Sequence, residues 1–274
     1  VSTVGEGSTG FNVRGGGIDQ NLVLLDEAPV YNSSHLFGFF SVFNPDAVKN
    51  VKLIKGGIAP EYGGRLSSIL DIRMKEGNKK EFTGSGGVGA IFSRLSLEGP
   101  IVKDKASFLI AGRRSYADVL AKPFLNDNIS GSQFYFYDLT AKVNYEMNSK
   151  NRFFLSGYFG RDVFGSGFLF NWGNATATLR WNHIFNEKLF MNLTGYYSDY
   201  DYAFGVEGDD RDDFEWSSSI VSYSVKPDFS YYLNNKNTIR FGGQSIYYDF
   251  KPAQAKFDSD GQTKDISLPE KFAM

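Results

Sequence analysis

The sequence of 274 residues contains no cysteine and only two histidines, His35 and His183. The absence of cysteine excludes disulfide bonds, thiolate nucleophiles and zinc sites with cysteine ligands. Two histidines cannot build a histidine-rich metal centre, and a lone histidine is more often solvated or hydrogen-bonded than metal-bound. We therefore predict no metal site and no cofactor.

The chain also has little net charge and few long apolar runs. The formal net charge is -2, with acidic and basic residues intermixed, so no field steers the chain toward nucleic acid, which we do not expect as a partner. The longest apolar candidate, Leu36 to Phe43, is interrupted and falls well short of the roughly 18 residues of a membrane helix. The nucleophile and zinc motifs G-x-S-x-G and H-E-x-x-H are missing, and we predict that the protein is not an enzyme.

One short stretch, Gly5 to Gly10, reads GEGSTG and matches the spacing of a dinucleotide-binding fingerprint. That fingerprint requires a strand before it and a helix after it. Only four residues precede Gly5, and the consecutive glycines 15–17 weaken any helix that follows. We interpret the match as chance and assign the glycines to tight turns.

Aromatic residues are abundant, with 26 Phe, 16 Tyr and 3 Trp, yet the mean hydropathy is -0.30. Large rings and a polar average coexist when each strand has one apolar and one polar face. From about residue 81 the sequence alternates in this way. In residues 138–147 the odd positions are apolar and the even ones polar, and residues 175–181 and 221–233 repeat the pattern. The pattern predicts long, two-faced β-strands.

The connections between these strands are of two kinds. Short polar turns occur at 103–105, 148–151, 186–188 and 234–237, and longer segments occur at 126–132 and 207–215. We expect about nine strands between residues 81 and 250, several of ten or more residues, against roughly five to six in soluble proteins. Long strands, unequal loops and aromatic clusters near strand ends, such as 134–137, 196–197 and 247–248, favour a membrane β-barrel with aromatic girdles.

The alternative is a secreted carbohydrate-binding β-sandwich whose aromatic faces stack on sugars. Its strands would alternate in the same way. In a sandwich, however, the apolar faces would form one central core, whereas in a barrel they would form an outward band.

Residues 1–78 have a different pattern, with glycine-rich turns between short strands. Apolar runs predict strands at 21–26, 51–55 and 68–74. The sequence Asn44-Pro45-Asp46 places a cap residue, a proline and an acid in succession, which predicts one or two helical turns. We therefore divide the chain into a small α/β region, residues 1–78, and a β region, residues 79–274.

The order of motifs in residues 11–78 resembles the plug of TonB-dependent outer-membrane receptors. Arg14-Gly15 and the strand before Asp26-Glu-Ala-Pro-Val30 are followed by residues 44–56, by Glu61-Tyr-Gly-Gly64 and by the strand at 69–75. Two departures are Glu27, where the family has glycine, and residues 65–68, where it has small residues. The resemblance implies a mainly β protein: an antiparallel transmembrane β-barrel preceded by a small α/β plug domain.

A lumen that holds a plug belongs to a barrel of about 22 strands, whereas a small barrel is filled by its own side chains. The expected nine strands are too few, so we expect this chain to be a partial barrel from a longer receptor. The TonB box would lie upstream of residue 1 and the remaining strands downstream of residue 274.

The resemblance also implies a function. Such a receptor lies in the outer membrane of a Gram-negative cell and contacts its lipid. It binds a scarce extracellular solute, such as a siderophore, glycan or peptide, and imports it with energy delivered by TonB and its inner-membrane complex. A surface lipoprotein is a candidate partner.

Two sets of site residues follow from the resemblance. Arg14 and Lys55 match basic plug positions that pair with acids of the barrel wall, the alternative being solvated strand residues. A second set falls where family plugs turn at their extracellular apex and is predicted to contact ligand, the alternative being a plain surface loop: Asp19, Gln20, Asn21, Asn32, His35 and Phe37.

Overall fold

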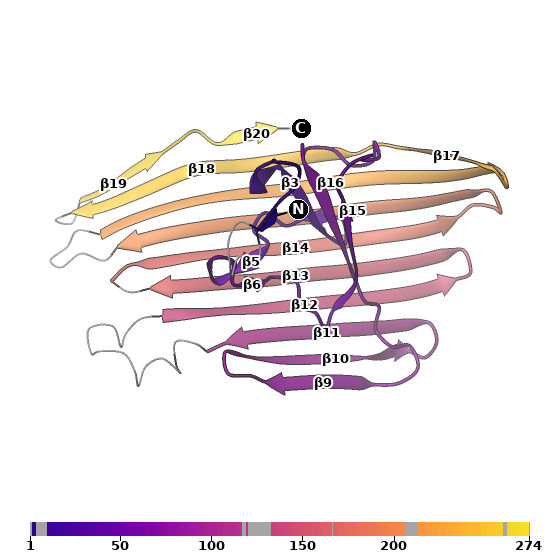
Figure 1. Cartoon of the computed structure of the whole chain (residues 1–274), viewed down its shortest axis with the longest axis horizontal. Helices are drawn as coiled ribbons and strands as arrows, with labels where there is room; N and C mark the ends of the chain where they lie inside the picture. Colours follow the sequence, from indigo (N-terminus) through magenta and orange to yellow (C-terminus); the bar gives the residue numbers. More distant parts are fainter. Residues whose placement is uncertain are drawn as a thin grey trace.

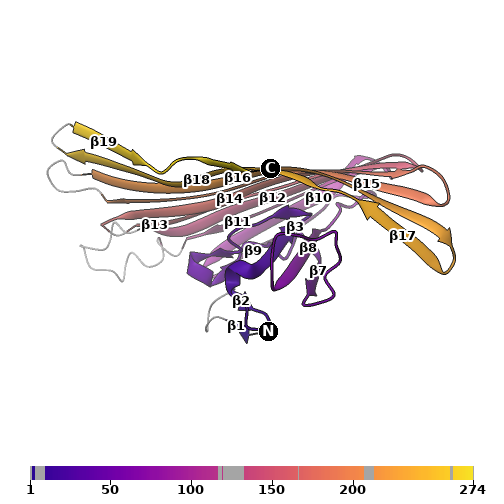
Figure 2. The same ribbon diagram turned by 90° about the horizontal axis from the view of Figure 1, so that it is seen from above.

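A large antiparallel sheet with a small domain against one face makes up the computed structural model of the chain (Figures 1 and 2). The structure describes residues 2–3, 10–116, 119, 133–165, 167–206, 213–259 and 262–273. We call the sheet from β9 to β20 the wall sheet and the described residues up to 74 the N-terminal domain. Figure 2 shows the sheet edge-on, with the N-terminal domain confined to one side.

From β9 to β16 the wall sheet follows chain order, each strand antiparallel to the next, and beyond them β18 pairs with β16 while β19 and β20 both pair with β18. Its strands are β9 (Thr83–Val88), β10 (Phe92–Val102), β11 (Ala106–Ser115), β12 (Gln133–Asn148), β13 (Asn151–Gly165), β14 (Leu169–Ile184), β15 (Leu189–Val206), β16 (Asp213–Asn234), β17 (Asn237–Gly242), β18 (Ser245–Ser259), β19 (Gln262–Ser267) and β20 (Lys271–Ala273). Both β17 and β18 pair with β16, so they share one position in the sheet. Within the described residues, β9 to β18 thus occupy nine adjacent positions, as predicted.

The alternation in these strands has the polar side buried and the apolar side exposed. In β12 the polar residues Asp138, Thr140, Lys142 and Asn144 are buried, whereas Leu139 between them and Met147 beyond them are 49% and 54% exposed. A soluble sandwich would reverse this order, so the sandwich alternative is wrong. An outward apolar band with a polar inner face is the arrangement of an outer-membrane barrel wall.

The aromatic clusters that we assigned to girdles are divided between the two faces. Tyr197 and Tyr247 lie on the outward face, whereas the neighbouring Tyr196 is buried on the inner face. Adjacent residues of a strand must point to opposite sides of the sheet, so only half of each cluster can form a girdle.

The N-terminal domain has a four-stranded sheet of order β4-β3-β8-β7, formed by β3 (Asn21–Leu25), β4 (Ala28–Pro29), β7 (Val48–Ile54) and β8 (Ser68–Met74). Strands β3 and β8 are parallel. Two-stranded pairs are formed by β1 (Ser2–Thr3) with β2 (Phe11–Asn12) and by β5 (Ser34–His35) with β6 (Phe40–Ser41). The hydrophobic core is completed from the wall sheet by Tyr158 and comprises Val23, Leu25, Val30, Val42, Ile72, Met74 and Tyr158.

The predicted helix after Asn44 is wrong. The Asn44 side chain accepts a hydrogen bond from the Asp46 N–H at 3.0 Å, but the chain makes only a turn before β7 begins at Val48. Pairing of β7 with β8 outweighs the local capping signal. The described part of the domain contains two 3-10 helices instead, η1 (Ile18–Gln20) and η2 (Leu36–Gly38).

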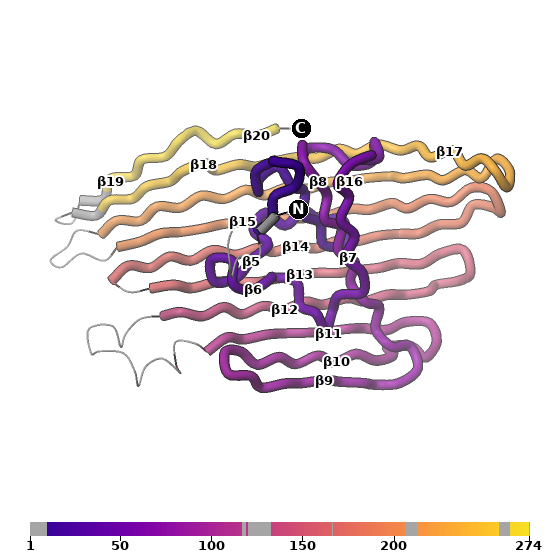
Figure 3. Tube along the Cα trace, viewed as in Figure 1, coloured from indigo at the N-terminus to yellow at the C-terminus, as the bar shows by residue number. Residues whose placement is uncertain are grey.

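Residues 75–82 connect β8 to β9 and carry the chain from the N-terminal domain to the wall sheet (Figure 3). The connection passes so close to the wall that a Cβ atom at Gly77 would overlap the backbone carbonyl of Phe108. The backbone N–H of Asn78 donates to Glu98, and Lys79 pairs with Glu146 at 3.1 Å. None of the described helices is long and apolar enough to cross a membrane.

Candidate functional site

The N-terminal domain is held to the wall sheet by buried charges. Lys142 Nζ of β12 lies 2.7 Å from a carboxylate oxygen of Asp26, and both side chains are almost fully buried. Lys142 also donates to the carbonyl of Met74 at 3.2 Å, and Asp26 accepts from the Met74 N–H at 3.1 Å. The pair is thus hydrogen-bonded on both sides, as buried charges require.

The turn that presents Asp26 has a strained backbone. Asp26 and Glu27 have φ values of 46° and 81°, in the left-handed region that non-glycine residues rarely adopt. Glu27 pairs with Arg73 at 2.9 Å and with Arg180 of the wall sheet at 3.5 Å. Burial alone would raise the pKa of Glu27, but the guanidinium groups of Arg73 and Arg180 lower it. Ion pairs therefore hold a carboxylate where the family resemblance leads one to expect glycine.

A second contact is centred on His35, which is 1% exposed. Its Nδ1 atom lies 2.6 Å from Asp162 and its Nε2 atom 3.3 Å from Asp138, while its ring stacks on Phe136 at 4.3 Å. The hydroxyl of Tyr158 lies 3.3 Å from Nε2. Burial alone would lower the pKa of His35, but the hydrogen bonds to Asp138 and Asp162 raise it. The two wall carboxylates therefore favour protonation of His35 relative to a free imidazole.

Arg113 of β11 extends this contact. It pairs with Asp138 at 2.6 Å and donates to the carbonyls of Ser41 and Val42 at 2.9 and 3.1 Å. One arginine thereby joins a wall carboxylate to the backbone of the N-terminal domain.

Apart from His35, which was predicted to contact ligand, the residues that make these contacts were not predicted from the sequence. Those missed are Asp26, Arg113, Asp138, Lys142 and Asp162. A signal for two of them was present, because Asp138 and Lys142 occupy polar positions of a strand that was correctly predicted to have two faces.

The predicted docking residues Arg14 and Lys55 lie elsewhere. Both are exposed, and together with Gln20 they line a hollow on the surface of the N-terminal domain. Among the described residues, neither has a carboxylate within ion-pair distance. Their pairing with wall acids stays a prediction.

The predicted ligand residues fall into two groups. Asp19 and Gln20 belong to η1, and Asn21 is buried, donating to the carbonyl of Phe11 at 2.8 Å and accepting from the Ser68 hydroxyl at 2.6 Å. Asn32, His35 and Phe37 lie together in the loop from β4 to β6. There Asn32 accepts through its carbonyl from Asn174 at 2.8 Å, and Phe37 is 55% exposed. Buried Asn21 and His35 have structural roles in this arrangement, and ligand binding by the set stays a prediction.

Phe37 is presented by an unusual backbone. Leu36, Phe37 and Gly38 have φ values of 49°, 58° and 111°, three successive residues in positive-φ conformations. The Leu36 N–H donates to Asp162 at 2.7 Å and so fixes this loop to β13. Strained loops held by surrounding structure are common where a protein positions a ligand-contacting side chain.

Phe37 packs against a line of aromatic residues on the inner face of the wall sheet. We call this line the ring row: Phe134, Phe164, Phe170, Phe204 and Trp216, which lie directly opposite one another on the five adjacent strands β12 to β16. The Phe37 ring lies 5.4 Å from Phe164 and 6.0 Å from Phe170, and 4.7 Å from Trp172 beside the row. The ring row lies at the edge of the sheet away from the short turns at 149–150 and 185–188. In outer-membrane barrels short turns face the periplasm.

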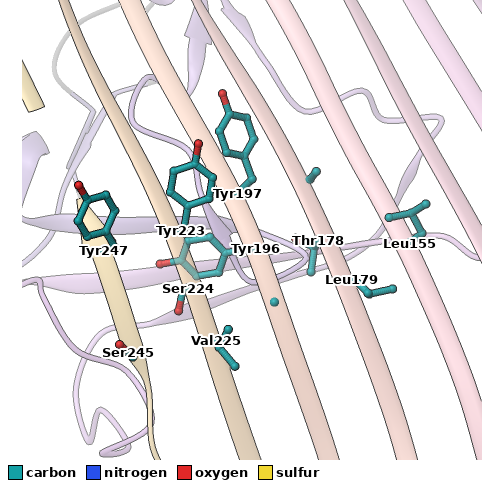
Figure 4. A pocket seen from close by; sticks show the side chains of 12 residues that line it. Leu155, Thr178, Leu179, Tyr196, Tyr197, Tyr223, Ser224, Val225, Ser245 and Tyr247 are labelled. Atoms are coloured by element: carbon teal, nitrogen blue, oxygen red, sulfur yellow. The ribbon is translucent and has the colours of Figure 1, made fainter. Parts of the chain in front are cut away.

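The outward face of the same strands carries a shallow apolar hollow (Figure 4). Leu155, Leu179 and Val225 border it on one side. The rings of Tyr197, Tyr223 and Tyr247 border it on the other, with their hydroxyls pointing the same way, away from the aliphatic side chains. Tyrosines at a membrane interface orient their polar ends toward water in this manner. The hollow therefore lies on the lipid-facing surface.

Comparison with known proteins agrees with this architecture. The family model described as the TonB-dependent Receptor Plug Domain matches residues 1–68. A search of proteins with curated functions finds no match by sequence.

Solved structures resemble the fold of nearly the whole chain. The copper transporter OprC superimposes with a TM-score of 0.66 at 12% identity over 92% of this chain and 42% of its own. BauA, the ferric preacinetobactin receptor from Acinetobacter baumannii, has a TM-score of 0.63 at 10% identity over 97% of this chain and 45% of its own. The ferric-catecholate import receptor Fiu from E. coli K12 has a TM-score of 0.61 at 12% identity over 94% and 46%. The chain thus spans less than half the length of these three proteins.

Proposed function

We propose that the chain belongs to a solute importer of the Gram-negative outer membrane. Two findings support this: the family model of the TonB-dependent receptor plug domain matches residues 1–68, and the wall sheet has the fold of such receptors. The receptor binds a scarce solute from outside the cell. TonB and its inner-membrane complex then supply the energy that displaces the N-terminal domain and admits the solute. This function requires binding and movement but no covalent chemistry.

We further propose that residues 1–78 are the plug domain and residues 79–274 the first part of the barrel wall. The wall sheet is open, with β9 at one edge and β19 and β20 at the other among the described residues. Open edges leave backbone groups unpaired, which lipid does not tolerate. Additional strands of the receptor would close the barrel, and carboxylates on them would pair with Arg14 and Lys55.

The observation that carries the proposal is the contact of Phe37 with the ring row. Phe37 belongs to the plug domain, and the ring row that it contacts belongs to the wall and lies away from the turns at 149–150 and 185–188. A ligand bound there would contact both parts at once. Binding energy could then alter the docking of the plug domain, because Leu36 and His35 in the same loop bind Asp162 of the wall.

The experiment that tests this function uses the source organism. Cells lacking the receptor gene and cells lacking TonB are compared with wild type for growth on limiting siderophores, vitamins, metal ions, glycans and peptides. The proposal expects one solute whose uptake is lost in both deletions. It is overturned if deletion of the receptor changes no uptake that depends on TonB.

A further inference from the structure

The inner face of the wall around the ring row is rich in rings and poor in charge. Neighbouring strands are about 4.8 Å apart, so the five residues of the ring row extend over roughly 19 Å. Ring contacts continue from its members to the surrounding residues: Phe204 lies 6.4 Å from Phe214, and Phe214 lies 5.0 Å from Phe257. This length suits a linear ligand better than a compact one.

The described residues of β12 to β16 place no cationic side chain on this part of the inner face. The inner-face positions from Asp162 outward, within the described residues, are Phe134, Phe136, Asp162, Phe164, Phe170, Trp172, Tyr202, Phe204, Val206, Phe214, Trp216 and Ser218. The nearby Arg161 lies on the opposite face, where it pairs with Asp201 at 2.6 Å and bonds Asn171. The one charged residue in the set, Asp162, is buried against His35. The nearest cationic groups, Arg113 and His35 beside Phe136, are buried and already paired with Asp138 and Asp162, so the described residues offer an anionic chelate no unpaired counter-charge.

The described residues around the ring row also offer no metal site. No group of three or more histidine, aspartate or glutamate side chains in the described part of the chain is arranged to hold a metal ion. A bare cation therefore has no ligand set at this surface.

The ring row does have polar groups beside it. Trp172 is 3% exposed, and its indole N–H has no hydrogen-bond partner among the described residues. Phe37 covers this indole at 4.7 Å and is itself half exposed. A shift of Phe37 would open the donor to a hydroxyl group of a ligand, and Tyr202, which also carries a hydroxyl, pairs with Trp172 on the next strand.

We infer that the ring row binds a linear, uncharged oligosaccharide. Sugar rings present flat C–H faces, and the electron-rich face of an aromatic ring attracts such groups. Their hydroxyls bond to neutral donors and acceptors and require no cation. The inference rests on the proposed import function and specifies its substrate class.

The test measures binding to the purified full-length receptor in detergent. The probes are linear hexasaccharides of glucose with α-1,4, β-1,3 and β-1,4 linkages, with mannan and xylan hexasaccharides, and the readouts are calorimetry and tryptophan fluorescence. The expected result is binding of at least one neutral hexasaccharide and much weaker binding of its monosaccharide. Phe170→Ala and Phe204→Ala should each weaken binding about tenfold or more, the scale seen when an aromatic anchor is removed.

A matched control is Phe159→Ala, because Phe159 lies on β13 near Phe164 but on the outward face, where it is 43% exposed. This variant should bind the hexasaccharide as wild type does. Thermal unfolding of each variant shows whether the variant is still folded. Phe170→Tyr keeps a stacking ring, so this variant should bind the hexasaccharide even though Phe170→Ala does not.

The inference is overturned if no hexasaccharide binds, or if binding is unaffected by both ring substitutions. Binding of only a ferric chelate, a copper ion or an aromatic peptide would also overturn it. In those cases TonB-dependent uptake of another solute by cells would leave the proposed import function intact. If cells with and without the receptor gene took up every TonB-dependent solute equally, the proposed import function itself would be wrong.

Discussion

Lys142 and Asp26 form a buried ion pair that joins the wall sheet to the N-terminal domain, with 2.7 Å between Lys142 Nζ and the Asp26 carboxylate. Removal of either partner leaves a buried charge without compensation. The pair therefore contributes to how tightly the two parts associate, together with the contacts of His35 and Arg113.

We expect Lys142→Met to destabilise the docked state by about 3–5 kcal/mol, since it leaves Asp26 buried and unpaired. Hydrogen exchange of β3 and β8 in the full-length receptor would measure the loss. The double variant with Asp26→Asn should recover part of it. Lys49→Met is the control, because Lys49 is exposed and 3.9 Å from Glu76, and an effect as large as that of Lys142→Met would contradict the assignment.

The His35 contact should make docking depend on pH. The raised pKa of His35 means that its stabilising contribution is fully present below the ordinary value of 6.5 and is lost as the pH rises through the raised value. Protection of the backbone amides between β5 and β6 against hydrogen exchange should therefore decrease as the pH rises through the raised pKa of His35. The measured exchange rates are first corrected for the intrinsic pH dependence of amide exchange. The groups that face His35 are Asp138, Asp162 and Tyr158, with Arg113 behind Asp138. His35→Gln should remove the dependence, and its persistence in that variant would reject the explanation.

Gly160 should be intolerant of substitution. A Cβ atom there would overlap the Tyr158 hydroxyl and lie 3.2 Å from the His35 ring. We expect Gly160→Ala to loosen the His35 contact by about 1–3 kcal/mol, the usual cost of overpacking. Gly157→Ala on the same strand is the control, because its Cβ would make only ordinary contact with Thr176. Equal exchange profiles for the two variants would refute the steric argument.

Glu27 combines a strained backbone with two ion pairs, and two substitutions can separate these effects. Both Glu27→Ala and Glu27→Gly remove the contacts with Arg73 and Arg180. Glycine tolerates the φ value of 81°, so the glycine variant should be more stable than the alanine variant by about 1–2 kcal/mol. The difference in unfolding free energy between the two variants measures the cost of the positive φ value. A more stable alanine variant would show that the turn changes conformation when the ion pairs are removed.

The outward face should reject charge. Leu179 is 55% exposed and lies among the lipid-facing side chains, so Leu179→Arg should cost about 2–4 kcal/mol in a bilayer. Folding of the full-length receptor into lipid vesicles, followed by gel mobility, would measure this. Ser149→Arg, in a short turn, should fold as wild type, and normal folding of Leu179→Arg would argue against a membrane face.

Much of the fold could be predicted from local pattern. The strands expected at 21–26 and 68–74 correspond to β3 and β8, because each is an apolar run bounded by turn residues. The alternation in 138–147 predicted the two faces of β12. The cap signal at Asn44 gave a wrong helix because residues 48–54 pair with β8, and this pairing between distant segments cannot be seen in the local sequence.

The site could be predicted only in part. Lys142 and Asp26 are 116 residues apart in sequence, so nothing local identifies them as partners. The ring row depends on register: Phe134, Phe164 and Phe170 align only when β12, β13 and β14 pair as they do. Alternation could have assigned each ring to a face, but only the register brings the rings into one line.

The eight residues 75–82 form a leash between β8 and the wall. Fully stretched, a leash of this length reaches at most about 29 Å. The end of the N-terminal domain next to the wall is therefore confined near β9. A domain that moved away from the wall would therefore stay tethered beside β9 and could return to the same place.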